Sequence, residues 1–232
     1  MKIDKIFIIN LESRTDRKDE ILNEMQKIKA NELCEIEVFN AISPTIELIE
    51  KWNPNFLNPI PKWAQKQNID PNHYRLGSFG CLLSHFSIIK KSLSLGYENI
   101  LIFEDDAEFT SYKEDLSTIL NKYSNLIKKA LDNFGIMYLG SNNNEKTIRK
   151  IIDNIYLTYG SLAAHSYIIN KNAMQFISDN LISYPKEIDQ FYQEIIQQQF
   201  QCITIYPPLV QQRKSFSNIL NKNVVYNFKN IR

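Results

Sequence analysis

The stretch NILIFEDD (residues 99–106) decides the fold. Its four consecutive apolar residues, Ile100 to Phe103, have the length and composition of a buried strand, which ends abruptly at three acids. Adjacent carboxylates repel one another, so placing Glu104, Asp105 and Asp106 together costs free energy unless a cation or hydrogen-bond donors offset the repulsion. Hard divalent cations such as Mg²⁺ and Mn²⁺ prefer these oxygen ligands. The stretch therefore predicts either a metal site at a strand end or a solvated acidic turn.

Strands and helices alternate on both sides of this stretch. Short apolar runs predict further strands at 5–10, 36–42, 135–140, 163–169 and 201–207. Apolar residues at helical spacing predict helices after the first strand, as far as residue 28, and at 77–95, 113–131, 171–181 and 186–199. This alternation is typical of a mainly parallel sheet between layers of helices. The sequence thus predicts a Rossmann-like α/β fold in a single domain, residues 1–232.

Capping side chains, glycine and proline predict where the helices begin and end. Ser13 or Thr15 is expected to cap the helix after the first strand, and Asn170 the helix after the fifth. Gly96 stands where a glycine commonly ends a helix. Pro185 is placed to open the last helix, because proline suits a first helical turn.

Composition limits the compartment and the partners. With 27 basic and 26 acidic residues the net charge is +1, so no overall field attracts nucleic acid. No segment approaches the roughly 20 apolar residues that span a bilayer, and the first apolar run is too short for a signal peptide. The three cysteines predict neither a disulfide framework nor a zinc motif, and Cys81 and Cys202 lie in apolar surroundings typical of buried thiols. We therefore expect a cytoplasmic protein without a membrane span or a nucleic-acid partner.

Two further clusters have side chains suited to ligand binding. In GSFGCLLSH (77–85), Gly80 and Ser84 share a helix face, where Ser84 is placed to hydrogen-bond a sugar or ribose. The alternative is tight packing of the helix on the sheet, with His85 as a satisfied buried histidine. In NLESRTDR (10–17), Arg14 and Arg17 follow the first strand and either hold a phosphate or remain surface residues.

Three later features have a chemical and a structural interpretation each. Asp189, in KEIDQFYQE (186–194), is either a general base or a solvent-facing helix acid. His165 is either a metal ligand or a structural histidine inside an apolar segment. The basic segment around Arg213 and Lys214 either folds over a diphosphate or forms a solvated terminus.

Together these segments resemble glycosyltransferase family 25, which includes bacterial lipopolysaccharide-type and collagen-type sugar transferases. The resemblance spans nearly the whole chain and keeps the family's segment order, with Asp189 where the family has an acid. The other segments that carry it are IFIINLESRTDR (6–17), GCLLSH (80–85), ILIFEDDAEF (100–109), GSLAAHSYIINKNAMQFI (160–177) and YPPLVQQRKSFSNI (206–219). Six matches in order are specific, although each alone is weak.

The resemblance implies a GT-A type fold and a sugar-transfer reaction. It implies a nucleotide-sugar-binding half at about 1–110 and an acceptor-binding half at about 111–232. The implied enzyme is an inverting, metal-dependent hexosyltransferase. It would move galactose or glucose from a UDP-sugar to an acceptor hydroxyl, on a glycan or on hydroxylysine of a collagen-like protein.

The resemblance also implies roles for individual residues. Asp106 would bind Mn²⁺ (or Mg²⁺) directly, with Glu104 and His165 as further candidate ligands, and Asp105 would contact ribose or a metal-bound water. Asp189 would act as the base that deprotonates the acceptor. The implied nucleotide-sugar-binding residues are Asn10, Leu11, Arg14, Ser84, Glu104 and Asp105.

Two positions depart from the family pattern. Ser78 stands where the family often has glutamate before the helix motif, which affects an expected donor or acceptor contact. Asn218 replaces the acid of the closing Ser-Asp-Ile, which affects the anchoring of that segment.

Two other functions use similar residues, and the acceptor site has its own candidate segment. One alternative is a catalytically silent carbohydrate- or nucleotide-binding module of the same fold. The other is a metal-dependent nucleotidyl- or phosphoryl-transfer enzyme, although the sequence lacks a glycine-rich phosphate loop. The long packed loop expected at 52–76 has Trp52, Trp63, His73 and Tyr74 as candidate acceptor contacts, unless both tryptophans belong to the core.

Overall fold

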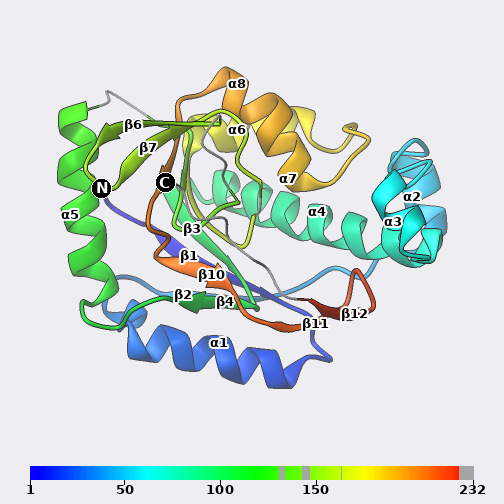
Figure 1. Cartoon of the computed structure of the whole chain (residues 1–232), viewed down its shortest axis with the longest axis horizontal. Helices are drawn as coiled ribbons and strands as arrows, with labels where there is room; N and C mark the ends of the chain where they lie inside the picture. Colours follow the sequence, from blue (N-terminus) through cyan, green and yellow to red (C-terminus); the bar gives the residue numbers. More distant parts are fainter. Residues whose placement is uncertain (131–133, 143–146, 163, 225–232) are drawn as a thin grey trace.

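A computed structural model describes residues 1–130, 134–142, 147–162 and 164–224. Its centre is an eight-stranded sheet (Figure 1). From one edge to the other the strands are β2 (Ile36–Asn40), β1 (Lys5–Asn10), β3 (Asn99–Glu104), β8 (Ser166–Asn170), β5 (Ile136–Tyr138), β9 (Cys202–Ile205), β7 (Ile155–Thr158) and β6 (Ile148–Ile152).

Most strands of this sheet point the same way. β1 pairs in parallel with β2 and β3, and β5 pairs in parallel with β9. β8 and β7 run against their neighbours, so six of the eight strands share one direction. The predicted α/β fold with a mainly parallel sheet is confirmed. Because β8 runs in the opposite direction, its first residues lie beside the last residues of β3, where β3 ends.

The sheet buries both of its faces, and successive side chains of each strand alternate between the two. In β1, Phe7 and Ile9 belong to one core, whereas Ile6 and Ile8 belong to the other. β3 alternates in the same way along Ile100 to Phe103. The apolar runs in the sequence are continuous because neither face of these strands meets water.

Helices cover each face. α1 (Thr15–Lys27) and α5 (Leu116–Ala130) pack against the face that carries Ile6 and Ile8. α4 (Pro71–Ser94), α6 (Lys171–Asn180) and α7 (Ile188–Phe191) pack against the other, and Figure 1 shows α1 and α4 on either side of β1. None of the described helices is both long and apolar enough to cross a bilayer.

The packed loop expected at 52–76 is confirmed only for residues 53–61, because helices occupy much of the rest. α2 (Ile46–Trp52) and α3 (Lys62–Lys66) flank its prolines, and α4 begins at Pro71 rather than at residue 77. The Asp70 side chain caps α4 by accepting a hydrogen bond from the backbone N–H of His73 at 2.7 Å. An aspartate cap followed by proline is a strong helix start.

Two other predicted helix starts are also wrong. The cap position of α1 is Arg14, without a side-chain capping bond, instead of Ser13 or Thr15. The last helical segment begins after Glu187, not in the turn of Pro185, and it continues from α7 through a π-helical stretch, η2 (Tyr192–Ile196), into α8 (Gln197–Gln199). The expected ends at Asn170 and Gly96 are confirmed.

Several short strands were not predicted. The hairpin of β6 and β7 extends the sheet, and the predicted start of β8 at residue 163 lies outside the described residues. Small additional sheets pair β10 (Val210–Gln212) with β4 (Ala107–Phe109) and β11 (Ser215–Ser217) with β12 (Lys222–Val224). The strands of these two small sheets have three residues each, which is too short to give a period in the sequence.

Gly80 lets the chain after β2 pass very close to α4. A Cβ on Gly80 would lie 2.4 Å from the carbonyl oxygen of Ile42 and 3.1 Å from Cδ of Pro44. The hydroxyl of Ser84, one turn later, accepts a hydrogen bond from the Ile42 N–H at 2.8 Å and donates one to the Gly80 carbonyl at 2.7 Å. Gly80 and Ser84 therefore fasten this connection to α4.

We predict that Gly80→Ala destabilises the fold by about 1–3 kcal/mol, since the backbone it meets has to shift. On a helix face with free space, a change from glycine to alanine stabilises the protein by about 1 kcal/mol. The sign of the change in unfolding free energy therefore shows whether the neighbouring backbone restrains this position. Urea unfolding of Gly80→Ala measures the effect, with Gly77→Ala on the same helix as the control. There the new Cβ meets Ile219 at 3.1 Å, so a smaller loss is expected. A Gly80→Ala variant at least as stable as the parent would show that the connection moves freely.

Candidate functional site

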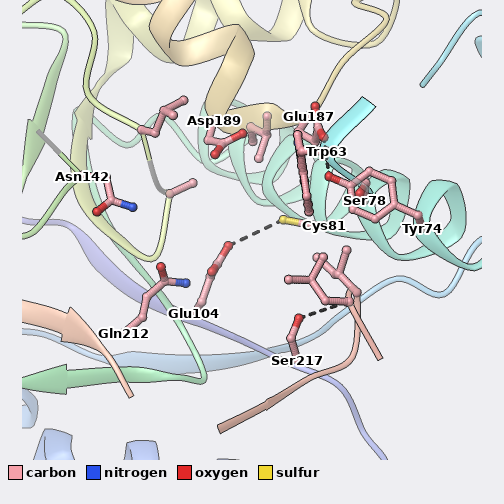
Figure 2. A pocket seen from close by; sticks show the side chains of 15 residues that line it. Trp63, Tyr74, Ser78, Cys81, Glu104, Asn142, Glu187, Asp189, Gln212 and Ser217 are labelled. Carbon is pink, nitrogen blue, oxygen red and sulfur yellow. Dashed lines mark hydrogen bonds between the residues drawn. The ribbon is translucent and has the colours of Figure 1, made fainter. Parts of the chain in front are cut away.

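A cavity of about 260 Å³ lies beside the end of β3. Glu104, the last residue of β3, lines it together with Ala164, which precedes β8. Figure 2 shows Glu104 and Gln212 on one side of this cavity, and Trp63, Tyr74 and Glu187 on the other. The expectation that ligand-binding residues gather where strands end agrees with this position.

The two-residue period of β3 continues into the acidic triplet and divides its side chains. Ile102 belongs to the core under α4, and Glu104, two residues later, contacts α4. Phe103 belongs to the opposite core, and Asp105 contacts α1. The acids are therefore not one exposed cluster.

Glu104 is held by two residues of α4. His85 Nε2 lies 3.2 Å from Glu104 Oε1, and the Cys81 thiol donates to the same oxygen at 3.6 Å. Burial by itself raises the pKa of Glu104, but the interaction with His85, together with those of His165 and Cys81, outweighs this effect, so the pKa lies below its ordinary value. Glu104 is thus favoured as a carboxylate at the cavity.

Asp105 is buried and bonded within the protein. Its carboxylate accepts hydrogen bonds from Asn10 Nδ2 at 2.9 Å and from the Arg17 guanidinium at 2.6 Å. Burial raises the pKa of Asp105, and the charge of Arg17 offsets only part of this effect. Asp105 therefore joins the ends of β1 and β3 to α1.

Asp106 has the least satisfied carboxylate of the three. Gln212 Nε2 approaches one oxygen at 3.4 Å, whereas the other oxygen, Oδ1, is buried without a hydrogen-bond partner among the described residues. Burial, together with the charge of Glu104, raises the pKa of Asp106 to about 7. A buried carboxylate in this state is suited to a cation that is not part of the polypeptide.

Asp189 reaches the same cavity from α7, although it is distant from Glu104 in sequence. Its Oδ1 accepts a hydrogen bond from the backbone N–H of Gln190 at 2.8 Å. The neighbouring Glu187 accepts a hydrogen bond from Tyr74 Oη at 2.6 Å. The predicted base position and the strand-end acid therefore line one cavity.

The remaining residues predicted to bind the nucleotide sugar do not line this cavity. Asn10 is buried beside Asp105, and Leu11 is half-buried at the end of β1. Arg14 bonds to Asp16, and to Asn218 Oδ1 at 2.5 Å. Ser84 is fully buried, and its hydroxyl is engaged by the backbone.

His165 is also buried and lies next to the acidic strand end. Its carbonyl oxygen accepts a hydrogen bond from the Glu104 N–H at 2.9 Å. Burial lowers the pKa of the His165 imidazole to about 4, which keeps the ring neutral.

The C-terminal segment closes one side of the cavity. The cavity is lined by four of its residues, Gln212, Ser217, Ile219 and Leu220. For this segment the sequence left two possibilities open, folding over a ligand or a solvated terminus, and the segment lies at the site. Arg17 holds the segment by donating to Ser215 Oγ at 2.6 Å and to the Phe216 carbonyl at 2.8 Å.

The two departures from the family pattern both lie in this region. Asn218 keeps an anchoring role, because its side chain accepts from Arg14 and its carbonyl oxygen lies 2.7 Å from His73 Nε2. Ser78 is buried and lines the cavity, where a glutamate would add a further charge.

Several cavity residues were missed by the sequence analysis. Cys81 was expected to be buried, but it is half-buried and lines the cavity, whereas Cys202 is buried as predicted. The spacing of four residues between Cys81 and His85 was an available signal, since it places both on one helix face. Asn142 and Leu162 carried no such signal, because they meet across an isolated bridge between distant segments.

Comparison with known proteins agrees with the resemblance. Residues 3–192 match the model of glycosyltransferase family 25, described as an LPS biosynthesis protein. Procollagen galactosyltransferase 2 of Mus musculus is 24% identical over 197 residues, which cover 82% of this chain and 30% of the relative. A procollagen lysyl hydroxylase and glycosyltransferase of Acanthamoeba polyphaga mimivirus is 29% identical over 203 residues, covering 82% and 21%. The chain thus spans less than a third of the length of these relatives.

Among solved structures, one similar chain is a glycosyltransferase involved in glycosylation of the major capsid of PBCV-1. It has 10% sequence identity and a TM-score of 0.43, covering 88% of this chain and 82% of the other. The sequence match over residues 3–192 establishes the relationship: the chain belongs to glycosyltransferase family 25.

Proposed function

We propose that this chain is an inverting hexosyltransferase that uses a UDP-sugar and a divalent cation. The single observation that carries the proposal is the cavity that Glu104, at the end of β3, and Asp189, on α7, both line. Family membership supports sugar transfer, and the two carboxylates supply the acid–base and charge chemistry that such a transfer needs. The proposed donor is either UDP-galactose or UDP-glucose.

The residues at the strand end fit a divalent cation. The unpartnered Asp106 Oδ1 and the Glu104 carboxylate are hard oxygen donors of the kind that Mn²⁺ and Mg²⁺ prefer. His165 is a third candidate, since a neutral imidazole is the form that binds metals. When bound there, the cation would neutralise charge on the departing diphosphate.

Asp189 is the proposed general base. A single displacement with inversion needs one group that takes the proton of the acceptor hydroxyl as its oxygen attacks the sugar. Glu187 also lines the cavity, but its carboxylate is engaged by Tyr74 Oη. Asp189 lines the same cavity and stands where the family has an acid, so we assign the role of base to it.

The other polar residues are proposed to act in two ways. Asn10, Asp105 and Ser84 are buried and bonded within the protein, so we assign them the support of the strand-end turn and of α4. Leu11 and Arg14 are only partly buried at the end of β1, and they remain the proposed edge of the nucleotide pocket.

Trp63 is the proposed platform for the acceptor. It lines the cavity while 45% exposed, and its ring meets Tyr74 edge-on at 5.7 Å between ring centroids. An exposed aromatic face offers apolar contact to a sugar ring or to the stem of a lysine-type acceptor. The names of the relatives favour hydroxylysine of a collagen-like chain, and the family description favours a glycan.

We predict that Asp106→Asn lowers the turnover of UDP-galactose or UDP-glucose at least 100-fold and removes Mn²⁺-dependent UDP binding. UDP release in the presence of Mn²⁺ measures turnover, and calorimetry measures binding. Asp19→Asn, an exposed acid on α1, is the matched control and should leave both unchanged. Unchanged turnover in Asp106→Asn would remove this residue from the mechanism, and release of pyrophosphate from a nucleoside triphosphate would indicate a nucleotidyltransferase instead.

The same substitution should stabilise the metal-free protein at alkaline pH. The pKa of Asp106 is about 7 in the fold against an ordinary 3.8, so the protonated form is favoured by folding. Its contribution to stability is present below about pH 4 and is lost as the pH rises through 7. In EDTA, Asp106→Asn should therefore unfold at a higher temperature than the parent at pH 8, with the difference shrinking toward pH 5. A difference independent of pH would contradict the raised pKa.

Asp189→Asn is expected to reduce kcat by at least 100-fold while donor affinity changes less than about threefold. The reason is that an amide cannot accept the acceptor's proton, although it keeps the size of the side chain. Steady-state kinetics and UDP-sugar binding distinguish the two effects. Glu187→Gln, at the cap of α7, is the comparison variant, because it removes a neighbouring charge and leaves Asp189 in place. A loss of donor affinity that accounts for the whole effect would make Asp189 a binding residue.

A further inference from the structure

Three side chains of different chemistry meet at the wall of the cavity. Cys81 Sγ, His85 Nε2 and a Glu104 carboxylate oxygen all lie within 4.8 Å of one another. We propose that these three residues form a second metal site, specific for zinc-type cations, which shares Glu104 with the oxygen-rich site at Asp106.

The distances suit tetrahedral coordination. Zinc bonds of about 2.0–2.2 Å to nitrogen and oxygen and about 2.3 Å to sulfur place ligand atoms about 3.4 Å (N to O) and about 3.6 Å (S to O) apart at the tetrahedral angle. In the structure, His85 Nε2 lies 3.2 Å and Cys81 Sγ lies 3.6 Å from Glu104 Oε1. A zinc ion therefore requires little rearrangement of these pairs.

The fold holds the three ligands on rigid elements. Cys81 and His85 are four residues apart on α4, so their side chains leave the same helix face. Glu104 is directed at this face by the alternation of β3. The site is thus built before a metal arrives, which lowers the cost of binding.

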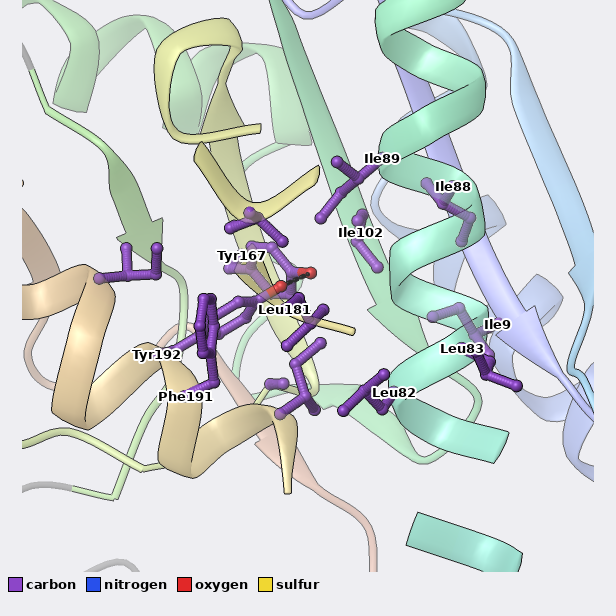
Figure 3. Close-up of a cluster of buried hydrophobic side chains, with 14 of the residues drawn as sticks. Ile9, Leu82, Leu83, Ile88, Ile89, Ile102, Tyr167, Leu181, Phe191 and Tyr192 are labelled. Atoms are coloured by element: carbon purple, nitrogen blue, oxygen red, sulfur yellow. Dashed lines mark hydrogen bonds between the residues drawn. The ribbon is translucent and has the colours of Figure 1, made fainter. Parts of the chain in front are cut away.

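A second layer of hydrogen bonds orients His85. Its Nδ1 lies 2.8 Å from Tyr167 Oη, which in turn lies 2.8 Å from Tyr192 Oη. Figure 3 shows Tyr167 and Tyr192 together in the buried cluster beside α4. Metal binding requires the Nε2 proton that faces Glu104 to leave. With Nδ1–H donating to Tyr167, Nε2 then presents a lone pair to the metal. Histidines that bind metals usually have their other ring nitrogen held in this way.

The ligand set selects the cation. One thiolate, one imidazole and one carboxylate favour zinc and related borderline-soft ions over Mg²⁺ or Mn²⁺, which prefer oxygen ligands. Binding replaces the proton of the Cys81 thiol by the metal, and that proton leaves to solvent. Cys81 and Glu104 line the cavity, so the fourth coordination position faces the cavity.

One consequence concerns the transfer reaction and rests on the proposed function. Glu104 would belong to both metal sites, and a zinc ion drawn toward Cys81 and His85 would hold its carboxylate away from the cation at Asp106. Zinc is therefore expected to inhibit the Mn²⁺-dependent transferase, without displacing Mn²⁺ from Asp106 itself.

Cobalt titration of the metal-free, reduced protein tests the site directly. Co²⁺ replaces zinc and gives thiolate charge-transfer absorption and strong visible bands when its geometry is tetrahedral. We expect these signals to saturate with one metal per chain, and zinc to abolish them. Cys81→Ser should lose the thiolate band and at least tenfold in affinity, whereas Cys34→Ser and Cys202→Ser should keep both.

Two further measurements keep the test decisive. His85→Asn should lose the tetrahedral visible bands, and circular dichroism of each variant checks that it is folded. Calorimetry of zinc binding in buffers of different ionisation enthalpy should report the release of at least one proton, that of the Cys81 thiol. The proposal is overturned if the wild-type protein gives no thiolate band, or if a folded Cys81→Ser variant keeps it. None of these measurements uses a nucleotide sugar, so a failure of the proposed transferase function leaves them unaffected.

Discussion

The change of side-chain direction from Glu104 to Asp105 governs the arrangement of this site. In an extended chain successive side chains point to opposite faces, so two adjacent acids at the end of β3 enter different layers of the protein. Glu104 meets Cys81 and His85 on α4, whereas Asp105 meets Arg17 on α1. One short acidic run thereby joins both helical layers to the sheet and leaves Asp106 at the turn between them.

This division also explains how three buried or half-buried carboxylates are tolerated. The guanidinium of Arg17 and the amide of Asn10 satisfy Asp105, and His85 stabilises the charge of Glu104. One carboxylate oxygen of Asp106 accepts a long hydrogen bond from the Gln212 amide. The other oxygen has no hydrogen-bond partner among the described residues. A site that binds a cation is expected to be destabilising without it, because the carboxylate has to remain available.

The lining of the cavity combines rigid elements with a segment from a distant part of the chain. α4 and β3 supply residues held by the packed core. The segment from Gln212 to Leu220 also lines the cavity, and Arg14 and Arg17 fasten it to the rest of the molecule. The same arginines that the sequence offered as phosphate ligands are engaged in this attachment.

The sequence by itself determined the alternation of strands and helices and the placement of three acids at a strand end. It also singled out Asp189 as a second acid of interest. The strands and helices follow from local periodicity, since a buried strand and an amphipathic helix each leave a pattern within about ten residues. The resemblance to the family singled out Asp189. The early start of α4 was local as well, because Asp70 and Pro71 form a cap signal that the apparent loop composition concealed.

Only the tertiary structure decided which of these residues meet. Ser84 and Asn10 looked like ligand contacts, yet both are engaged in bonds inside the protein. Cys81 looked like an ordinary buried thiol, yet it faces Glu104 at the cavity. The physical reason is that these contacts join segments far apart in the chain. The packing of α4 and α1 on opposite faces of the sheet sets them, and no local pattern records that packing.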